Sequence, residues 1–196
     1  EGELAGVSAM TAALLGKGSI TIDKDSFNEE VDFMGATINF GSQSASASSL
    51  SRYFGRVLEL MADAALNPNF TQEEFDKERD ILLDGIKSGE KSVTTAARRV
   101  ENLLAYGKDH PFGEYVSKES VERVNLADVD AFYKRYFLPN NAYLVIVGDV
   151  DAGDLKKQVK KLFGKWKKGD LSTDAISEAS NVNSTQIDFV NMPNAV

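Results

Sequence analysis

The sequence predicts an α+β fold, a mostly antiparallel sheet with helices packed on one of its faces. Three observations carry this prediction. Several segments repeat their apolar side chains with the spacing of an amphipathic helix. Helix-like and strand-like segments each occur in pairs, without the regular alternation that indicates a parallel sheet. Gly, Pro and Asn residues separate the segments, as they do at turns.

Two helices open the chain. Residues 3–16 place their apolar side chains on one helical face, and Gly16 ends the helix. A second helix is expected to begin at Asp25 or Ser26, since either side chain can cap the first turn. This helix is expected to run to about Met34, because the glycine that follows is a common helix stop.

Two strands and a third helix follow. Residues 36–40 have a strand pattern. Residues 43–50 alternate Ser with Ala, so they form either the partner strand or a closely packed segment. Residues 52–66 return to helical spacing, and the Asn-Pro-Asn turn at 67–69 ends it. These segments supply a pair of strands and a helix to the predicted sheet.

The middle of the chain is predicted to be helical. Thr71 begins a long helix that is interrupted near Gly89 and resumes over 93–106. Ser117 and Asn125 are of the residue types that cap helices, so two shorter helices are expected after them.

The last third of the chain carries the clearest strand signal. Residues 142–147 form an apolar run that is typical of a strand buried on both faces. Residues 155–163 form a final helix. The composition then changes to Ser, Asn, Asp and Ala over 169–184, as in a linker. Residues 186–191 form one more strand after it.

Composition excludes several classes of site and partner. The chain has 196 residues, 42% of them hydrophobic, which is enough for one or two domains with a core. A formal net charge of −8 argues against nucleic acid as the main partner. There is no cysteine, so disulfides and cysteine-ligated zinc are excluded. No apolar run approaches the roughly 20 residues of a membrane span.

One histidine and one basic run are candidate functional features. His110 lies in a loop before a proline, where it is structural, exposed or catalytic. Zinc ligation by histidine normally needs a second histidine nearby, which the chain lacks. Seven lysines surround Trp166 between Lys156 and Lys168. They fit either the solvated face of a helix or a patch for an anionic partner.

Taken in order, a series of short stretches resembles the pitrilysin-like zinc metallopeptidases, the family that includes mitochondrial processing peptidase and insulin-degrading enzyme. The stretches are 6–19, 35–40, 58–63, 67–70, 78–82, 110–113 and 139–150. None of them is specific alone, and the resemblance lies in their order over about residues 3–168. It implies a peptidase-like α+β domain over 1–168 without the family's first strands, a linker over 169–184, and the first strand of a following homologous domain over 185–196.

The resemblance also indicates what this chain lacks. Active members of the family carry a His-x-x-Glu-His motif, whose two histidines bind zinc and whose glutamate activates water. The corresponding residues here are Ala9, Ala12 and Ala13. The family's third zinc ligand is a glutamate seven residues after the Glu of a Glu-Arg pair, and counting from Glu78 leads to Gly85. Methyl groups and glycine bind no divalent cation, so no metal site and no cofactor are expected in this chain.

The resemblance therefore implies a zinc-free pseudo-enzyme domain, the inert half of a clamshell that encloses a peptide. Its expected partners are an active half or subunit, which carries His-x-x-Glu-His and the zinc, and an unfolded peptide substrate. The alternative is a non-proteolytic module that binds peptides or belongs to a larger complex. An active zinc endopeptidase is the least favoured interpretation, because one histidine cannot build the usual site. The resemblance and the lack of cysteine favour a periplasmic or otherwise exported bacterial protein.

The resemblance assigns one further role, that of the family's edge strand. In active halves this strand binds substrate by pairing with a peptide strand. The corresponding residues here are Ala36, Thr37, Ile38, Asn39 and Phe40. They are expected to pair with a peptide, with a partner half or only with their own sheet.

Overall fold

The computed structural model describes residues 1–171, 175–176, 178–179 and 182–192. The chain divides into two compact units, and each unit draws on separate parts of the sequence. The first unit combines residues 1–7 with residues 77–125 and with the described part of the C-terminal segment. The second unit combines residues 8–76 with residues 126–171. Among the described helices, none is long and apolar enough to cross a membrane.

The second unit contains α2 (Lys24–Phe33) and nearly all of α1 (Val7–Leu15), the two helices that the sequence predicts. The cap of α2 differs from the predicted one. The carboxylate of Asp23 accepts hydrogen bonds from the backbone amides of Asp25 and Ser26, each at 3.0 Å. Asp23 is therefore the N-cap, because only from its position does a side-chain oxygen reach the amides of the first turn.

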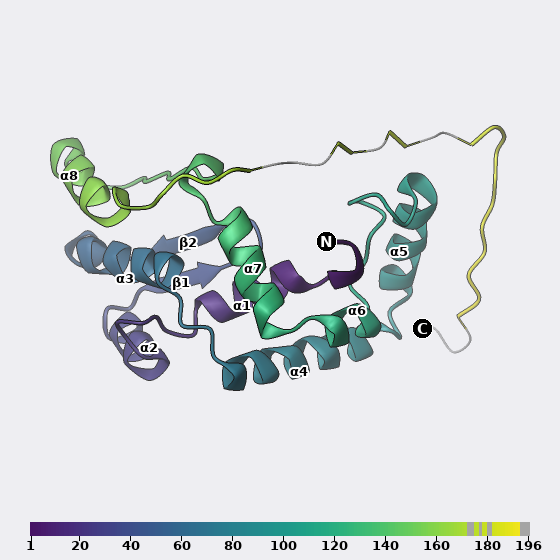
Figure 1. Cartoon of the computed structure of the whole chain (residues 1–196), viewed down its shortest axis with the longest axis horizontal. Coiled ribbons are helices and arrows are strands. Elements are labelled where there is room, and N and C mark those ends of the chain that lie inside the picture. The colour runs from purple at the N-terminus through teal and green to yellow at the C-terminus, as the bar shows by residue number, and fades with distance from the viewer. Residues whose placement is uncertain (172–174, 177, 180–181, 193–196) are drawn as a thin grey trace. The chain divides into compact units, whose positions relative to one another are not determined.

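The sheet is much smaller than predicted. Strands β1 (Thr37–Phe40) and β2 (Ala45–Ser48) pair in antiparallel fashion, with Thr37 opposite Ser48 and Phe40 opposite Ala45. Within the described part of the chain, these two strands make up the whole sheet. The α+β class and the antiparallel pairing are confirmed, whereas the larger sheet that the other predicted strands would form is not supported. Figure 1 shows that helices form most of the regular structure.

Two predicted strands do not form in the described residues. Residues 142–147 and the segment that begins at 186 have no strand pairing. In the first of these segments, Val145 is 80% and Val147 is 92% exposed. A strand is stable only when its backbone groups pair with a neighbour, and neither β1 nor β2 pairs with either segment. Residues 142–147 therefore have the composition of a buried strand, but no described strand lies beside them to pair with.

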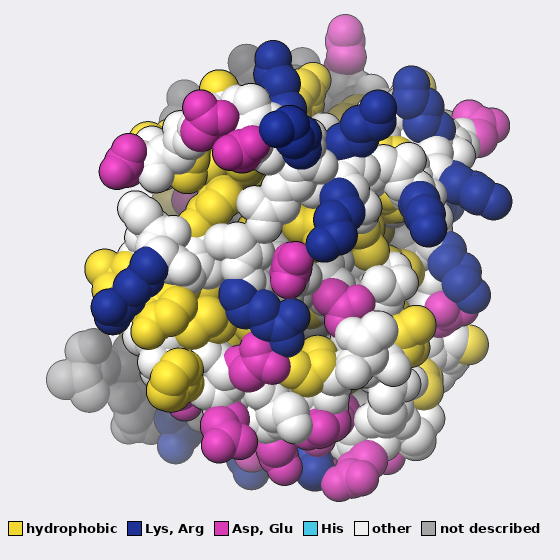
Figure 2. Space-filling model, turned by 90° about the vertical axis from the view of Figure 1, so that its left-hand side faces the viewer, with side chains coloured by type: hydrophobic (Ala, Val, Ile, Leu, Met, Phe, Trp, Pro, Cys, Tyr) yellow, Lys and Arg dark blue, Asp and Glu magenta, His cyan; other side chains and the backbone are white. Residues whose placement is uncertain are grey.

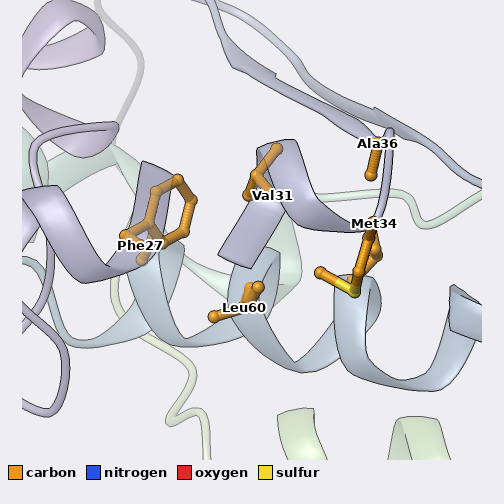
Figure 3. Close-up of a cluster of buried hydrophobic side chains, with 7 residues drawn as sticks. Phe27, Val31, Met34, Ala36 and Leu60 are labelled. Atoms are coloured by element: carbon orange, nitrogen blue, oxygen red, sulfur yellow. The ribbon is translucent and has the colours of Figure 1, made fainter. Parts of the chain in front are cut away.

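A buried cluster joins α2 to α3 (Phe54–Leu66). The cluster contains Phe27, Val31, Met34, Ala36, Val57, Leu60 and Ala64. Figure 3 shows its labelled members gathered where α2 lies beside α3. Phe27 is 3% exposed, and burial of a side chain of this size contributes about 1.5–3 kcal/mol. The half-buried Ile38 and Phe40 pack against the same cluster, which supports one face of β1.

Helices α7 (Leu126–Tyr136) and α8 (Ala152–Phe163) complete the second unit. Burial raises the pKa of Tyr133 to about 12, so its hydroxyl keeps its proton. This hydroxyl donates to the Ala65 carbonyl near the end of α3, at 2.8 Å. The side-chain amide of Gln158 on α8 donates to the Gly55 carbonyl near the start of α3, at 3.0 Å. Later helices thus hold α3 at both of its ends.

The first unit contains η1 (Gly2–Leu4), α5 (Val93–Tyr106), α6 (Lys118–Arg123) and most of α4 (Gln72–Gly89). The predicted helix break near Gly89 and the predicted cap at Ser117 are confirmed. Ser117 and Ser120 form a reciprocal capping box at the start of α6. The buried hydroxyl of Ser120 also donates to the Ala5 carbonyl at 2.7 Å, which ties the start of the chain to α6.

The predicted domain boundaries stay a prediction. The linker over 169–184 and the following strand over 185–196 include residues 172–174, 177, 180–181 and 193–196, which lie outside the described residues.

Candidate functional site

Helix α1 carries three of the positions at which active relatives are expected to hold zinc and a general base. Ala9, Ala12 and Ala13 lie at helical spacing, so their side chains share one side of α1. Ala12 is 7% exposed, and the other two alanines are half-buried. Met10 and Leu15 are at most 1% exposed. Apolar side chains therefore bury α1 on nearly all sides, as in a core helix.

The fourth position, Gly85, lies on α4 in the first unit, whereas the three alanines lie in the second unit. Gly85 is exposed, and a Cβ atom built there would meet no atom within 4 Å. Zinc in proteins is bound by imidazole, thiolate or carboxylate groups. These four residues offer none of them, so they do not fit the metal. Over the described ranges, no group of three or more His, Asp or Glu side chains is placed to hold a metal ion.

Hydrogen bonds fasten the segment that follows α1. The hydroxyls of Ser19 and Thr21 both donate to the carboxylate of Asp63 on α3, and Asn67 donates to the same carboxylate at 2.8 Å. Burial by itself raises the pKa of Asp63, but these hydrogen bonds and the charge of Arg56 outweigh it and hold the pKa below its usual value. The end of α1 is thus held by contacts that need no metal.

The sequence alone does not indicate the role of Asp63. Its hydroxyl partners lie 44 and 42 residues away along the chain, so no local spacing indicates the contact. The one available signal is a carboxylate flanked by the buried Ala62 and Ala64 of α3, where an acidic side chain needs a partner.

Strand β1 is the second candidate site. One of its edges pairs with β2, and no described strand pairs with its other edge. Ile38 and Phe40 are half-buried against the core, whereas Thr37 and Asn39 are exposed. Ala36 leads into the strand, and its amide donates to the end of α2 at 3.1 Å. The unpaired edge offers backbone N–H and C=O groups that an extended peptide could use.

An ion pair fixes α2 against α3 and so supports the core on which β1 rests. Arg56 of α3 donates two hydrogen bonds to the carboxylate of Glu30 on α2, at 2.7 and 2.9 Å. These hydrogen bonds hold the pKa of Glu30 below its usual value and raise the pKa of Arg56 above its own. The side chains are 47% and 41% exposed, so water screens the pair and its contribution is modest, about 0.2–1 kcal/mol.

His110 has a structural role. Its side chain is 8% exposed and stacks on Tyr106 with ring centroids 4.9 Å apart. Its Nδ1 atom accepts a hydrogen bond from the backbone amide of Phe112 at 3.0 Å. These contacts close the turn after α5 and account for the histidine without a catalytic role.

The lysines around Trp166 are all exposed. Lys157 pairs with Asp154 at 2.9 Å, and Lys161 pairs with Glu59 at 3.6 Å. Figure 2 shows basic side chains gathered in the upper right of the view, with acidic side chains among them and along the lower edge. One side of α8 packs against α3. The exposed lysines are what the solvated side of such a helix is expected to carry.

Fold and site together define a peptidase-like domain whose metal-binding chemistry is missing. The family model described as "Insulinase (Peptidase family M16)" matches residues 1–111, more than half of the chain. The model described as "Peptidase M16 inactive domain" matches residues 123–194. The chain therefore belongs to the M16 peptidase family, and its resemblance to the pitrilysin-like peptidases is confirmed.

The chain is similar to proteins of more than one kind. It is 25% identical to an "uncharacterized zinc protease" of Mycobacterium leprae over 171 residues, 82% of this chain and 37% of that protein. It is 23% identical to cytochrome b-c1 complex subunit 1 of Bos taurus over 170 residues, 84% of this chain and 35% of that subunit. It superimposes on a peptidase M16 inactive domain from Pseudomonas fluorescens with a TM-score of 0.77 and 22% identity, covering 91% of this chain and 46% of that one.

The chain spans less than half the length of these three relatives. The likeness to the P. fluorescens structure establishes the shared fold. At the level of the family, the match of residues 123–194 to the inactive-domain model agrees with the predicted non-catalytic half, and the role of this chain in a clamshell is a proposal.

Proposed function

We propose that this domain acts as the zinc-free half of a two-part peptidase and helps to enclose an unfolded peptide beside an active half. The observation that carries the proposal is the set of alanines on α1, in a chain that belongs to the M16 family. Alanine favours helix and needs no polar partner, so α1 keeps its fold while it lacks every group that would bind zinc. The zinc, and the glutamate that activates water, belong to the partner half.

The peptide-enclosing role rests on β1. Its unpaired edge is made of backbone atoms, which the alanine substitutions on α1 leave unchanged. Pairing along a strand edge accepts many sequences, because main-chain hydrogen bonds supply most of the affinity. A protein that handles unfolded peptides of varied sequence requires this kind of binding.

A second candidate function is a non-proteolytic subunit of a larger complex. The similarity to cytochrome b-c1 complex subunit 1 favours it, since that relative is named as part of a complex. This function also fits a domain with no metal chemistry. A periplasmic or exported location, which the sequence favours, stays a prediction.

Metal analysis and peptidase assays of the full natural protein test the proposal. We expect no zinc at this domain and no cleavage of an unfolded casein peptide by this domain alone. Cleavage should require a half that carries His-x-x-Glu-His and should stop on chelation. If the natural chain itself contains that motif, changing its Glu to Gln should abolish all cleavage. Zinc-dependent cleavage that survives this change would overturn the proposal.

The same preparation separates the two candidate functions. Stable association with a motif-bearing half, together with cleavage by the pair, favours the peptidase. Stable association with a complex that has no zinc and no peptidase activity favours the structural subunit.

A further inference from the structure

Helix α5 and the loop that follows it enclose a small pocket in the first unit, of about 230 Å³. Its lining residues are Thr95, Arg98, Arg99, Asn102, Gly113, Glu114 and Tyr115. The four residues from α5 are spaced along the chain so that they share one side of the helix. The residues that line the pocket therefore carry two guanidinium groups, a hydroxyl, an amide, a carboxylate and an aromatic ring.

The wall opposite α5 is closely fitted. A Cβ atom added to Gly113 would lie 1.9 Å from the carbonyl oxygen of Gly107 at the end of α5. Only glycine allows this approach of the loop to the helix. The amide of Gly113 also donates to the His110 carbonyl at 2.9 Å. The buried ring of His110 in turn stacks on Tyr106 of α5. The pocket thus has a defined wall that packing and hydrogen bonds hold against α5.

The charges in the pocket are not balanced. Among the described residues, neither Arg98 nor Arg99 forms an ion pair, although the chain as a whole is acidic. The one carboxylate in the lining, that of Glu114, accepts a hydrogen bond from the backbone amide of Gly2. The exposed Glu101, also on α5, forms no ion pair with either arginine in the described structure. Two arginines beside one carboxylate leave an excess of positive charge in the lining, which favours the entry of an anion.

One of the arginines is already oriented. The guanidinium carbon of Arg99 lies 5.2 Å from the centroid of the Tyr115 ring, within the range of a cation–π contact. A guanidinium held on a ring loses less conformational freedom when it binds, and its planar fork matches the two oxygens of a carboxylate.

We propose that this pocket, hereafter the Arg98–Arg99 pocket, binds the carboxylate of a peptide. Its volume is below the roughly 300–1,000 Å³ of sites for drug-sized ligands, so it suits one carboxylate-bearing residue and not a nucleotide. That carboxylate belongs either to the C-terminus of the peptide or to an Asp or Glu side chain. The site goes beyond the enclosing role of the domain, because residues of this chain alone form the pocket and bind the carboxylate, without an active half.

Isothermal titration of the full natural protein with matched probes tests the site. The probes are acetylated trialanine with a free carboxylate, its C-terminal amide, acetyl-Ala-Glu-Ala-amide and inorganic phosphate. We expect the free acid or the Glu peptide to bind, whichever source of carboxylate the pocket takes, and the trialanine amide not to bind. The affinity should fall as NaCl is added, because salt screens exposed charges.

Substitutions locate the site. Arg98→Gln or Arg99→Gln should weaken binding of the carboxylate probe about tenfold or more, as expected when a charge-assisted hydrogen bond is lost. Arg99→Lys keeps the charge but removes the fork, so it should weaken binding by a smaller factor. Arg135→Gln is the matched control, because its guanidinium also lies 5.2 Å from a tyrosine ring but lies outside the pocket. Circular dichroism of each variant verifies that it folds.

Three results would overturn the proposal. They are equal binding of the trialanine amide and the acid, stronger binding of phosphate than of both carboxylate probes, and wild-type affinity in folded Arg98→Gln and Arg99→Gln variants. Zinc content and peptide cleavage do not enter this test. The Arg98–Arg99 pocket and the proposed function therefore stand or fall separately.

Discussion

Helix α1 and strand β1 lie in the same unit, yet they depend on their sequences in different ways. The chemistry expected at α1 rests on three side chains, and alanine at those positions removes it. The binding expected at β1 rests on backbone groups, which every residue except proline provides. A substitution can thus delete a metal site without touching a strand edge. This difference explains how alanines can replace the expected metal-binding residues of a peptidase-family domain without changing the strand edge that we propose to bind peptides.

The largest predicted effect tests whether α1 is now a core helix. Ala12→Glu places a carboxylate where the side chain is 7% exposed. We expect it to lower the free energy of unfolding by about 3–5 kcal/mol, the cost of an uncompensated buried charge. Ala13→Glu on the same helix is the control, and it should cost clearly less because Ala13 is half-buried. Urea denaturation measures both. Equal, small losses would mean that α1 keeps room for the ancestral glutamate.

The second prediction concerns what holds the end of α1 without a metal. Asp63→Asn should lower the free energy of unfolding by about 1–3 kcal/mol, because it weakens hydrogen bonds from two hydroxyls to a charged group, the Ser19 contact part-buried and the Thr21 contact exposed. The folded pKa of Asp63 lies below its unfolded value. Its stabilisation is therefore complete above the unfolded pKa of about 4, and it disappears as the pH falls through the lower folded value. Thermal melts between neutral and acidic pH should show this loss in the wild type and a shallower one in Asp63→Asn.

The third prediction separates backbone from side chain in β1. Asn39 is exposed, so Asn39→Ala should leave binding of a labelled Val-Thr repeat peptide nearly unchanged. The amide of Gly41 donates to the Ser44 carbonyl across the hairpin. In the alternating antiparallel pattern, the amide of Asn39 therefore faces β2 and that of Phe40 faces the edge that no described strand covers. Phe40→Pro therefore removes a donor of that edge and should weaken binding about tenfold. Fluorescence anisotropy measures both affinities, and the melting temperature distinguishes loss of the edge from loss of the sheet. If alanine and proline weaken binding equally, side chains carry the recognition and the contrast with α1 fails.

The smallest effect concerns the support of β1. Glu30→Gln should lower the free energy of unfolding by about 0.5 kcal/mol, because its partner Arg56 and Glu30 itself are half in water. Added salt should reduce this difference. Lys157→Ala is the control, since it breaks a pair whose side chains are 81% and 79% exposed, and it should change nothing measurable. A loss above 2 kcal/mol for Glu30→Gln would mean that the pair is far less screened than its exposure indicates.

The helices could be predicted from the sequence because their signals are local. Ser117 acts within the next turn of the chain, and the break at Gly89 needs only that residue and its neighbours. The predicted cap of α2, Asp25 or Ser26, lies two or three residues after the observed one, since Asp23, Asp25 and Ser26 all suit a cap and only geometry chooses among them.

The sheet and the polar contacts could not be predicted in the same way. Residues 142–147 have the composition of a strand, but a strand depends on a neighbour elsewhere in the chain. The pairing of Ser19 with Asp63 likewise joins residues 44 apart. The candidate site follows the same rule. The alanines of α1 can be identified from the order of the family-like stretches along the sequence. The pocket formed by α5 and the loop that follows it depends on tertiary contacts, which the sequence does not show.

The hydrogen bond from Ser120 to Ala5 also has a consequence for biosynthesis. It joins residues that are 115 apart in sequence, so the first unit combines segments that a long stretch of chain separates. Closing a loop of this length carries an entropic cost that only the completed contacts repay. During synthesis, residues 1–7 therefore cannot form this contact until α6 has left the exit tunnel of the ribosome.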